Sequence, residues 1–311
     1  VMFDYGLTTV NEERLDPDII HLIDSLQQAG KMKINVYAMI TANQKNMDLY
    51  FKKGIYKTNQ LNVRSFKMYG DGALGSRGAC MHKPYSDSPK QFGALLSPVP
   101  QLKAVAQQIA NSPFQLNTHA IGDSANTVLL KIYKEVLTGK KDRRWKIEHA
   151  QVIQESDFDY FKLGIIPSVQ PTHATSDMYW AGDRLGKDRL KNAYAYKKLL
   201  QKAGAIALGT DFPVEEVNPV LTFHAAVARQ DVKGFPKNGF QIENALSREE
   251  TLKGMTLWAA YSNFEEKEKG SLEVGKWADF VVFDADLMQV EASQIVKMKP
   301  SNTFIKGAKQ K

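Results

Sequence analysis

Short apolar runs alternate with amphipathic stretches along most of the chain. Runs such as 34–41 (INVYAMIT) and 205–208 (AIAL) predict buried strands. Stretches with apolar residues at helical spacing, such as 17–29, predict helices. We also expect a short strand at 6–10, a loop at 171–188, and one helix at 247–264 opened by a capping box of Ser247 and Glu250. The two kinds of segment alternate about seven times before residue 211, which is typical of a parallel sheet covered by helices. The sequence therefore predicts an α/β fold, either a parallel barrel or a doubly wound sheet.

Three predicted strands end in a side chain that can bind a metal: His119, His149 and Asp211. Because the carboxyl ends of parallel barrel strands meet at one mouth, we expect these side chains to lie close together. Each histidine taken alone is better explained as a buried core residue. Two imidazoles and a carboxylate at equivalent positions instead favour a shared metal site. Asp211 would also be placed to move a proton there.

Lys67 lies in the predicted strand 63–69 and has two interpretations. It is either a lysine whose charged end reaches out of the strand end, or a buried lysine of lowered pKa that takes up carbon dioxide as a carbamate and bridges metal ions. An unmodified ammonium would repel a metal. Glu148 is expected to face away from His149 on an ideal strand, which makes it structural.

Composition narrows the class of protein. The 311 residues suffice for one large barrel or two ordinary domains, and the single cysteine, Cys80, excludes an internal disulfide. The net charge is +7, but the lysines are scattered, so we expect no nucleic-acid partner. No apolar run approaches the roughly 18 residues of a membrane span. We expect a cytoplasmic protein, with an export signal in an absent N-terminal part left open, because Val1 lies inside an element and indicates a chain cut from a longer one.

Six sequence motifs follow one another over nearly the whole chain: FKMYGDGALGSR (66–77), THAIGD (118–123), IEHAQ (147–151), SVQPTHATSDM (168–178), GTDFPVE (209–215) and KGSLEVGKWADFVVFD (269–284). They resemble the signatures of the amidohydrolase superfamily, in particular its family 3 branch, which includes N-substituted formamide deformylases. The motifs also run in that family's order.

The resemblance implies a (β/α)8 TIM-type barrel at residues 1–265 and a C-terminal part of a small β-sandwich at 266–311. It implies one or two divalent ions, zinc first, and hydrolysis of an amide or other non-peptide C–N bond in a small molecule. The implied roles are a carbamate at Lys67, metal ligands at His119 and His149, a ligand and proton shuttle at Asp211, and substrate contacts from Arg77, His173, Trp180 and Arg184.

One departure from the family pattern weakens this picture. The family's first barrel strand ends in a His-x-His pair, and no two of the six histidines here are separated by a single residue. We therefore expect the first strand to be missing, the barrel to be open, and metal to be bound weakly or not at all.

Two alternatives to an active amidohydrolase follow. In the first alternative, the chain as it stands is a truncated, non-catalytic fragment with an incomplete metal site. Its open strand edge then predicts pairing into a homodimer. A metal-free carbohydrate hydrolase is disfavoured, because it needs a second acid at a strand end near Asp211. Only the loop residues Asp71 and Asp123 offer one.

Overall fold

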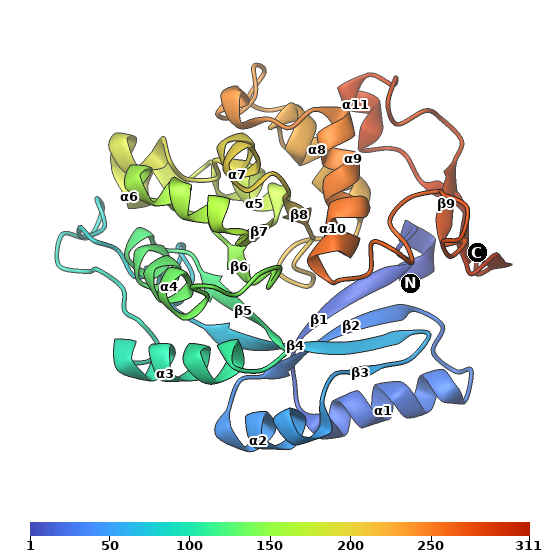
Figure 1. Ribbon diagram of the computed structural model, residues 1–311. Helices are drawn as coiled ribbons and strands as arrows, with labels where there is room; N and C mark the ends of the chain where they lie inside the picture. The colour runs from blue at the N-terminus through green and yellow to red at the C-terminus, as the bar shows by residue number, and fades with distance from the viewer.

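Seven parallel strands form one curled sheet in the computed structural model, which describes residues 1–311 (Figure 1). Each strand pairs in parallel with the next one in the sheet, and β3 (Tyr56–Lys57) pairs antiparallel with β4. No ladder joins β8 to β1, so the sheet has two free edges. The order is β1 (Thr9–Leu15), β2 (Asn35–Thr41), β4 (Leu61–Tyr69), β5 (Gln115–Ala120), β6 (Lys146–His149), β7 (Ile166–Val169) and β8 (Ala207–Leu208).

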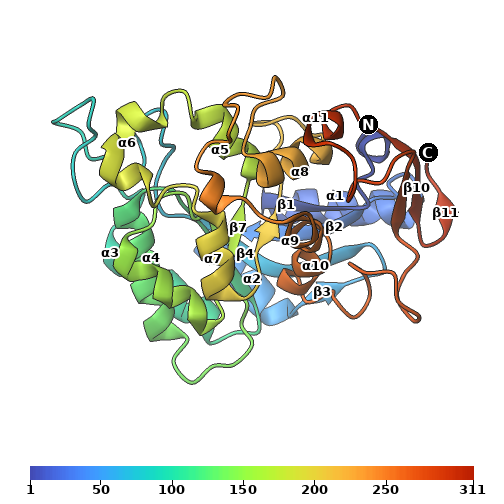
Figure 2. The ribbon, with the colours of Figure 1, turned by 90° about the horizontal axis from the view of Figure 1, so that it is seen from above.

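Helices connect successive strands along the outside of the curl. Figure 1 shows α1 and α2 beside β1 to β3, and Figure 2 shows the helices around the sheet from above. None of them is long and apolar enough to cross a bilayer. The helices are η1 (Met2–Tyr5), α1 (Pro17–Gln28), α2 (Gln44–Lys53), α3 (Val99–Ala110), α4 (Asp123–Val136), η2 (Glu155–Leu163), α5 (Pro171–Asp177), α6 (Ala181–Leu190), α7 (Tyr196–Ala203), α8 (Pro219–Ala228), η3 (Ile242–Asn244), α9 (Arg248–Met255), α10 (Leu257–Ser262) and α11 (Ala292–Ile295).

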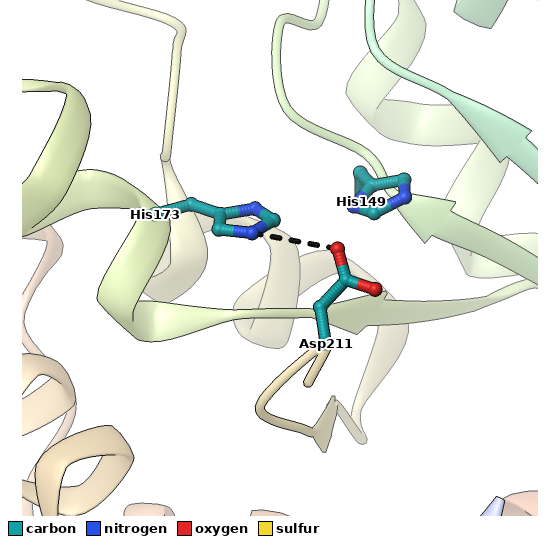
Figure 3. Close-up of side chains that lie close together, drawn as sticks. All are labelled: His149, His173 and Asp211. Carbon is teal, nitrogen blue, oxygen red and sulfur yellow. Dashed lines mark ion pairs between the residues drawn. The ribbon is translucent and has the colours of Figure 1, made fainter. Parts of the chain in front are cut away.

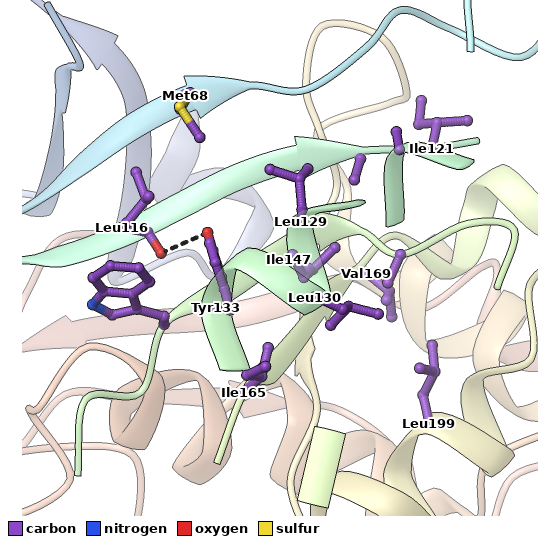
Figure 4. Packing of buried hydrophobic residues seen from close by; sticks show 14 of the residues in the cluster. Met68, Leu116, Ile121, Leu129, Leu130, Tyr133, Ile147, Ile165, Val169 and Leu199 are labelled. Carbon is purple, nitrogen blue, oxygen red and sulfur yellow. Dashed lines mark hydrogen bonds between the residues drawn. The ribbon is translucent and has the colours of Figure 1, made fainter. Parts of the chain in front are cut away.

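The hydrophobic core fills the space between the sheet and these helices. It contains 53 buried residues, and side chains from β4 to β7 and from α4 and α7 meet in it (Figure 4). Strand β5 shows the alternation that produces it: Leu116 and Ala120 join the core, whereas Asn117 and His119 face the other side. The hydroxyl of Tyr133 donates to the carbonyl of Leu116 across 3.3 Å, which ties α4 to the sheet.

The inner face of the curl is polar. Lys67, Asn117, Lys146 and Glu148 are all buried there, each at most 2% exposed. One side-chain oxygen each of Asn117 and Glu148 has no hydrogen-bond partner. Since buried polar atoms in folded proteins are nearly always paired, this interior is suited to a polar or charged ligand.

A second, antiparallel sheet is built from the C-terminal residues. Strands β9 (Phe280–Phe283), β10 (Pro300–Ile305) and β11 (Ala308–Lys309) lie in the order β11-β10-β9. The Thr303 hydroxyl donates to the carbonyl of Phe3 across 2.8 Å, so η1 packs on this sheet and the two chain ends meet (Figure 1). The expected domain boundary at residues 265 and 266 falls between α10 and β9.

Three element predictions differ from the structure. A strand was predicted at 6–10, but β1 spans Thr9–Leu15. Because β1 lies at a free edge of the sheet, its sequence TVNEERL is mostly polar, and the apolar pattern that predicts a buried strand is absent. The predicted helix 247–264 has the expected capping box but breaks at Thr256 (φ −128°, ψ −88°), and both halves contact β8. The predicted loop 171–188 contains α5 and most of α6.

Candidate metal centre

Three side chains converge where β6, β7 and β8 end. One ligand atom each from His149, His173 and Asp211 lies within 4.8 Å of the other two (Figure 3). His149 closes β6, His173 lies on α5 directly after β7, and Asp211 follows β8. His173 Nε2 lies 3.5 Å from Asp211 Oδ2. The cluster therefore joins segments that are up to 62 residues apart in the sequence, which is the span from His149 to Asp211.

His119 flanks this cluster. Its ring centroid lies 4.5 Å from that of His149, which stacks in turn on His173 at 5.6 Å. His119 Nε2 lies 3.6 Å from an oxygen of Asp71, beyond hydrogen-bond distance, and has no partner. Of the three predicted strand-end residues, His149 and Asp211 are therefore in the cluster and His119 lies beside His149, whereas His173, predicted to contact substrate, is the third member of the cluster.

Two of these residues have a strained backbone. His149 has φ 74° and Asp211 has φ 58°, both in the left-handed region that non-glycine residues avoid. Such a conformation costs roughly 1–2 kcal/mol per residue and is characteristic of functional sites. At His149 it also breaks the strand alternation. Glu148 pairs in the ladder with His119 and lies inside the curl with it, so the expectation that Glu148 faces away from the site is wrong.

The histidines of the site are neutral at pH 7. Burial lowers the pKa of His119 to about 4, and the charge of Lys67 adds to this effect. Burial also lowers the pKa of His173 to about 4. For His149, burial, followed by the neighbouring His119 and Lys67, holds the pKa well below its ordinary value. Neutral imidazoles have free lone pairs, the form in which histidine binds metal.

The Asp211 carboxyl group has the opposite shift. Burial, and then the charge of Glu13, raises its pKa to about 6. Glu215 lies nearby, 3.9 Å from His173 Nε2, and accepts a hydrogen bond from the Ser176 hydroxyl at 2.7 Å. A carboxyl group whose pKa is close to neutral exchanges protons readily at physiological pH.

Lys67 forms an ion pair on the inner face of the sheet. Its Nζ lies 2.5 Å from a carboxylate oxygen of Glu13 on β1. Burial opposes the charge of Lys67, but the carboxylates of Glu13 and Glu148 outweigh it and raise the pKa of the amine. In this arrangement Lys67 is an ammonium group, so the predicted carbamate requires both deprotonation and displacement of Glu13.

The arginines predicted to contact substrate meet at one carboxylate. Arg77 donates from Nε and Nη2 to Asp87 at 3.1 and 2.9 Å, and Arg184 pairs with the same carboxylate. Arg184 Nε also donates to the carbonyl of Gly75 at 3.2 Å. The Trp180 ring covers Gly75 so closely that a β-carbon there would lie 3.3 Å from it. These residues join the loop after β4 to α6, and a contact with substrate stays a prediction.

Sequence reasoning missed Gln170 and considered Asp71 only as a loop carboxylate. Asp71 accepts backbone N–H bonds from Cys80, Ile121 and Gly122 at 2.8, 3.0 and 2.8 Å. Burial nevertheless raises its pKa to about 7. Gln170 accepts from His149 Nδ1 across 2.7 Å. Gln170 had a detectable signal, because it ends the apolar run IIPSVQ at the position equivalent to the predicted ligands.

The donor set suits a divalent metal. Zinc binds imidazole nitrogen and carboxylate oxygen at about 2.0–2.2 Å, so two ligands of one ion lie at most about 4.4 Å apart. A cluster within 4.8 Å needs only a small inward movement to meet that limit. The buried Nε2 atoms of His119 and His173 also have no hydrogen-bond partner, so both are available to bind a metal ion.

Comparisons with known proteins identify relatives. The amidohydrolase family model (Amidohydro_3) matches residues 3–308. The chain is 32% identical over 272 residues to Protein LONG AFTER FAR-RED 3 of Arabidopsis thaliana. The aligned residues make up 86% of this chain and 46% of that protein. It is 24% identical over 198 residues to the N-substituted formamide deformylase of Arthrobacter pascens, covering 62% and 35% respectively.

A solved structure agrees with these matches. An uncharacterized metal-dependent hydrolase from Pyrococcus horikoshii OT3 superposes with a TM-score of 0.82 at 29% identity. The superposition covers 93% of this chain and 58% of that one. The chain thus spans less than half the length of the two sequence relatives described above.

Proposed function

The chain belongs to the amidohydrolase family, and from this premise we propose that it cleaves an amide or another non-peptide C–N bond of a small molecule with water. One observation supports the proposal most strongly: the ligand atoms of His149, His173 and Asp211 lie within 4.8 Å of one another. The strained backbone at two of these residues is a second, independent sign of a functional site.

These three side chains would hold a divalent ion, for which zinc is the first candidate. His119, 4.5 Å from His149 between ring centroids, is the adjacent ligand predicted from the sequence, and Lys67 is a further one if it is carboxylated. A zinc ion held there supplies Lewis-acid chemistry, since it polarises a carbonyl group and makes water more acidic.

Asp211 would carry the proton. Water attacks the carbonyl carbon as Asp211 takes one of its protons on a carboxylate oxygen. The C–N bond then breaks as Asp211 returns the proton to the leaving nitrogen, which gives an acid and an amine. A pKa of about 6 suits both halves of this transfer, because the group is ionised at pH 7 yet protonated at little cost.

We also propose the complete architecture of the barrel and the substrate class. The curled sheet would be the greater part of a (β/α)8 barrel, with its free edges β1 and β8 on either side of one further strand. N-substituted formamides are the first substrate class to test, because one relative bears the name of an enzyme that acts on them.

The test combines metal analysis with a substrate panel. Protein purified without chelator is expected to hold zinc and to hydrolyse members of a panel of N-substituted formamides and acetamides. Asp211→Asn should abolish turnover, whereas Glu216→Gln, which changes an exposed carboxylate in the same loop, should not. Sub-stoichiometric metal and no turnover in the unmodified chain would favour the non-catalytic fragment.

A further inference from the structure

One buried hydrogen bond determines which nitrogen of His149 is free. His149 Nδ1 lies 2.7 Å from Oε1 of Gln170, and the two residues are 9% and 7% exposed. A carboxamide oxygen only accepts hydrogen bonds, so the proton of a neutral His149 resides on Nδ1. The lone pair is then on Nε2.

Gln170 is itself held firmly in place. Its backbone carbonyl accepts a hydrogen bond from the buried Tyr196 hydroxyl at 2.9 Å and another from the backbone N–H of His173 at 3.0 Å. It directly follows β7 and is the N-cap residue of α5, the helix that carries His173. One residue therefore contacts two members of the cluster, His149 through its side chain and His173 through its main chain.

We propose that Gln170 is a positioning residue that fixes His149 as the Nδ1–H tautomer and thereby presents Nε2 to the metal ion. This inference rests on the proposed metal site, not on the identity of the substrate. A histidine ligand generally needs such an acceptor on its second nitrogen, and losing the acceptor typically weakens metal binding 10- to 100-fold. Without it, the imidazole would populate both tautomers and the ring would be free to rotate.

The first test measures zinc affinity by competition with a chromogenic chelator at pH 7.5. Gln170→Leu is expected to weaken zinc binding about 10- to 100-fold. Gln170→Glu, which keeps an acceptor at the same distance, should restore affinity to within about threefold of the wild type. Gln27→Leu is the matched control, because it removes a similarly buried carboxamide, 5% exposed, on α1. Gln27 donates to the carbonyls of Ile34 and Gln60, which precede β2 and β4, whereas the cluster lies where β6, β7 and β8 end.

The second test starts from the metal-free wild type, so its first measurement needs neither a variant nor a bound metal. Nitrogen-15 spectra of the histidine rings in the metal-free wild type should show His149 protonated on Nδ1 and unprotonated on Nε2. In Gln170→Leu, the two His149 nitrogens should move towards averaged shifts. A proton on Nε2 in the wild type would mean that the amide nitrogen of Gln170 donates to Nδ1 instead, which overturns the inference.

The outcomes separate this inference from the proposed reaction. Wild-type zinc affinity in a folded Gln170→Leu variant overturns it, as does a wild type that binds no zinc. If the predicted tautomer and the loss of zinc affinity are both found while the amide panel is not hydrolysed, the role of Gln170 stands and only the proposed reaction fails.

Discussion

Replacing His173 should remove the stabilisation that zinc gives to this protein. The sequence assigned His173 to substrate and His119 to metal, whereas the structure gathers His173 with His149 and Asp211 within 4.8 Å. The variants His173→Ala and His119→Ala therefore distinguish the two ligand sets. Under the proposed function zinc binds the folded chain, so the melting temperature should rise in proportion to the logarithm of the zinc concentration over Kd.

The size of the effect follows from the length of the chain. At a zinc concentration 100 times Kd, the stabilisation is about 2.7 kcal/mol. An unfolding entropy of about 2.1 cal/mol/K per residue gives about 0.65 kcal/mol/K for 311 residues. The melting temperature should then rise by about 4 °C. If His173→Ala weakens binding 100-fold, the same zinc concentration yields about 0.4 kcal/mol, or a rise of less than about 1 °C.

The assay is a thermal melt with and without zinc, followed by circular dichroism. His21→Ala, a change on the exposed face of α1, is the control and should keep the full shift. A full shift in His173→Ala together with a lost shift in His119→Ala would refute the reasoning and support the ligand set read from the sequence. No shift in the wild type at any zinc concentration would refute both.

Three further predictions concern the surroundings of the site. A β-carbon on Gly122 would lie 2.1 Å from the Cys80 carbonyl oxygen. Gly122→Ala should therefore lower the free energy of unfolding, measured by urea titration, by at least about 1–3 kcal/mol. A β-carbon on Gly209 would meet nothing within 4 Å, so the control Gly209→Ala should change this free energy by less than about 0.5 kcal/mol. The folded pKa of His173 is about 4 against 6.5 in the unfolded chain, so its stabilising effect is present above pH 6.5 and lost as the pH falls towards 4. Metal-free wild type should therefore lose about 2 kcal/mol relative to His173→Ala between pH 8 and pH 5, and equal pH dependence of the two proteins would contradict this assignment. Because Glu13 raises the pKa of Lys67, Glu13→Gln should favour the neutral amine, and a carbamate carbon signal after labelling with carbon-13 dioxide should be stronger in Glu13→Gln than in the wild type. A stronger signal in the wild type would mean that the Glu13 ion pair does not compete with carboxylation.

Local sequence pattern predicted the parts of the site that follow apolar runs. His119 is the penultimate residue of β5, His149 is the last residue of β6, and Asp211 follows β8. Each comes at the end of an apolar run, and the ends of parallel barrel strands meet at one mouth, so the pattern was enough to predict where these side chains lie. Whether these residues bind metal stays a prediction. The family assignment is confirmed by the match to residues 3–308.

Other parts of the site depend on contacts that no local pattern contains. His173 looked like a loop residue because Pro171 and the polar residues around it hide the short helix α5. The ion pair between Glu13 and Lys67 joins strands that are two places apart in the sheet. The His149 ring lies beside His119 although Glu148, not His149, is the ladder partner of His119, and this position involves a φ of 74° at His149 that nothing in the residue type requires.

The contact between the two ends of the chain couples distant parts of the molecule. Thr303 and Lys311 donate to the carbonyls of Phe3 and Asp4, just before the strand that carries Glu13. Local unfolding of the small sheet would break these hydrogen bonds and make β1 more mobile. The ion pair between Glu13 and Lys67 would then be weakened. Amide hydrogens of β10 and β1 should therefore exchange with solvent in one shared opening event, although about 300 residues separate them along the chain.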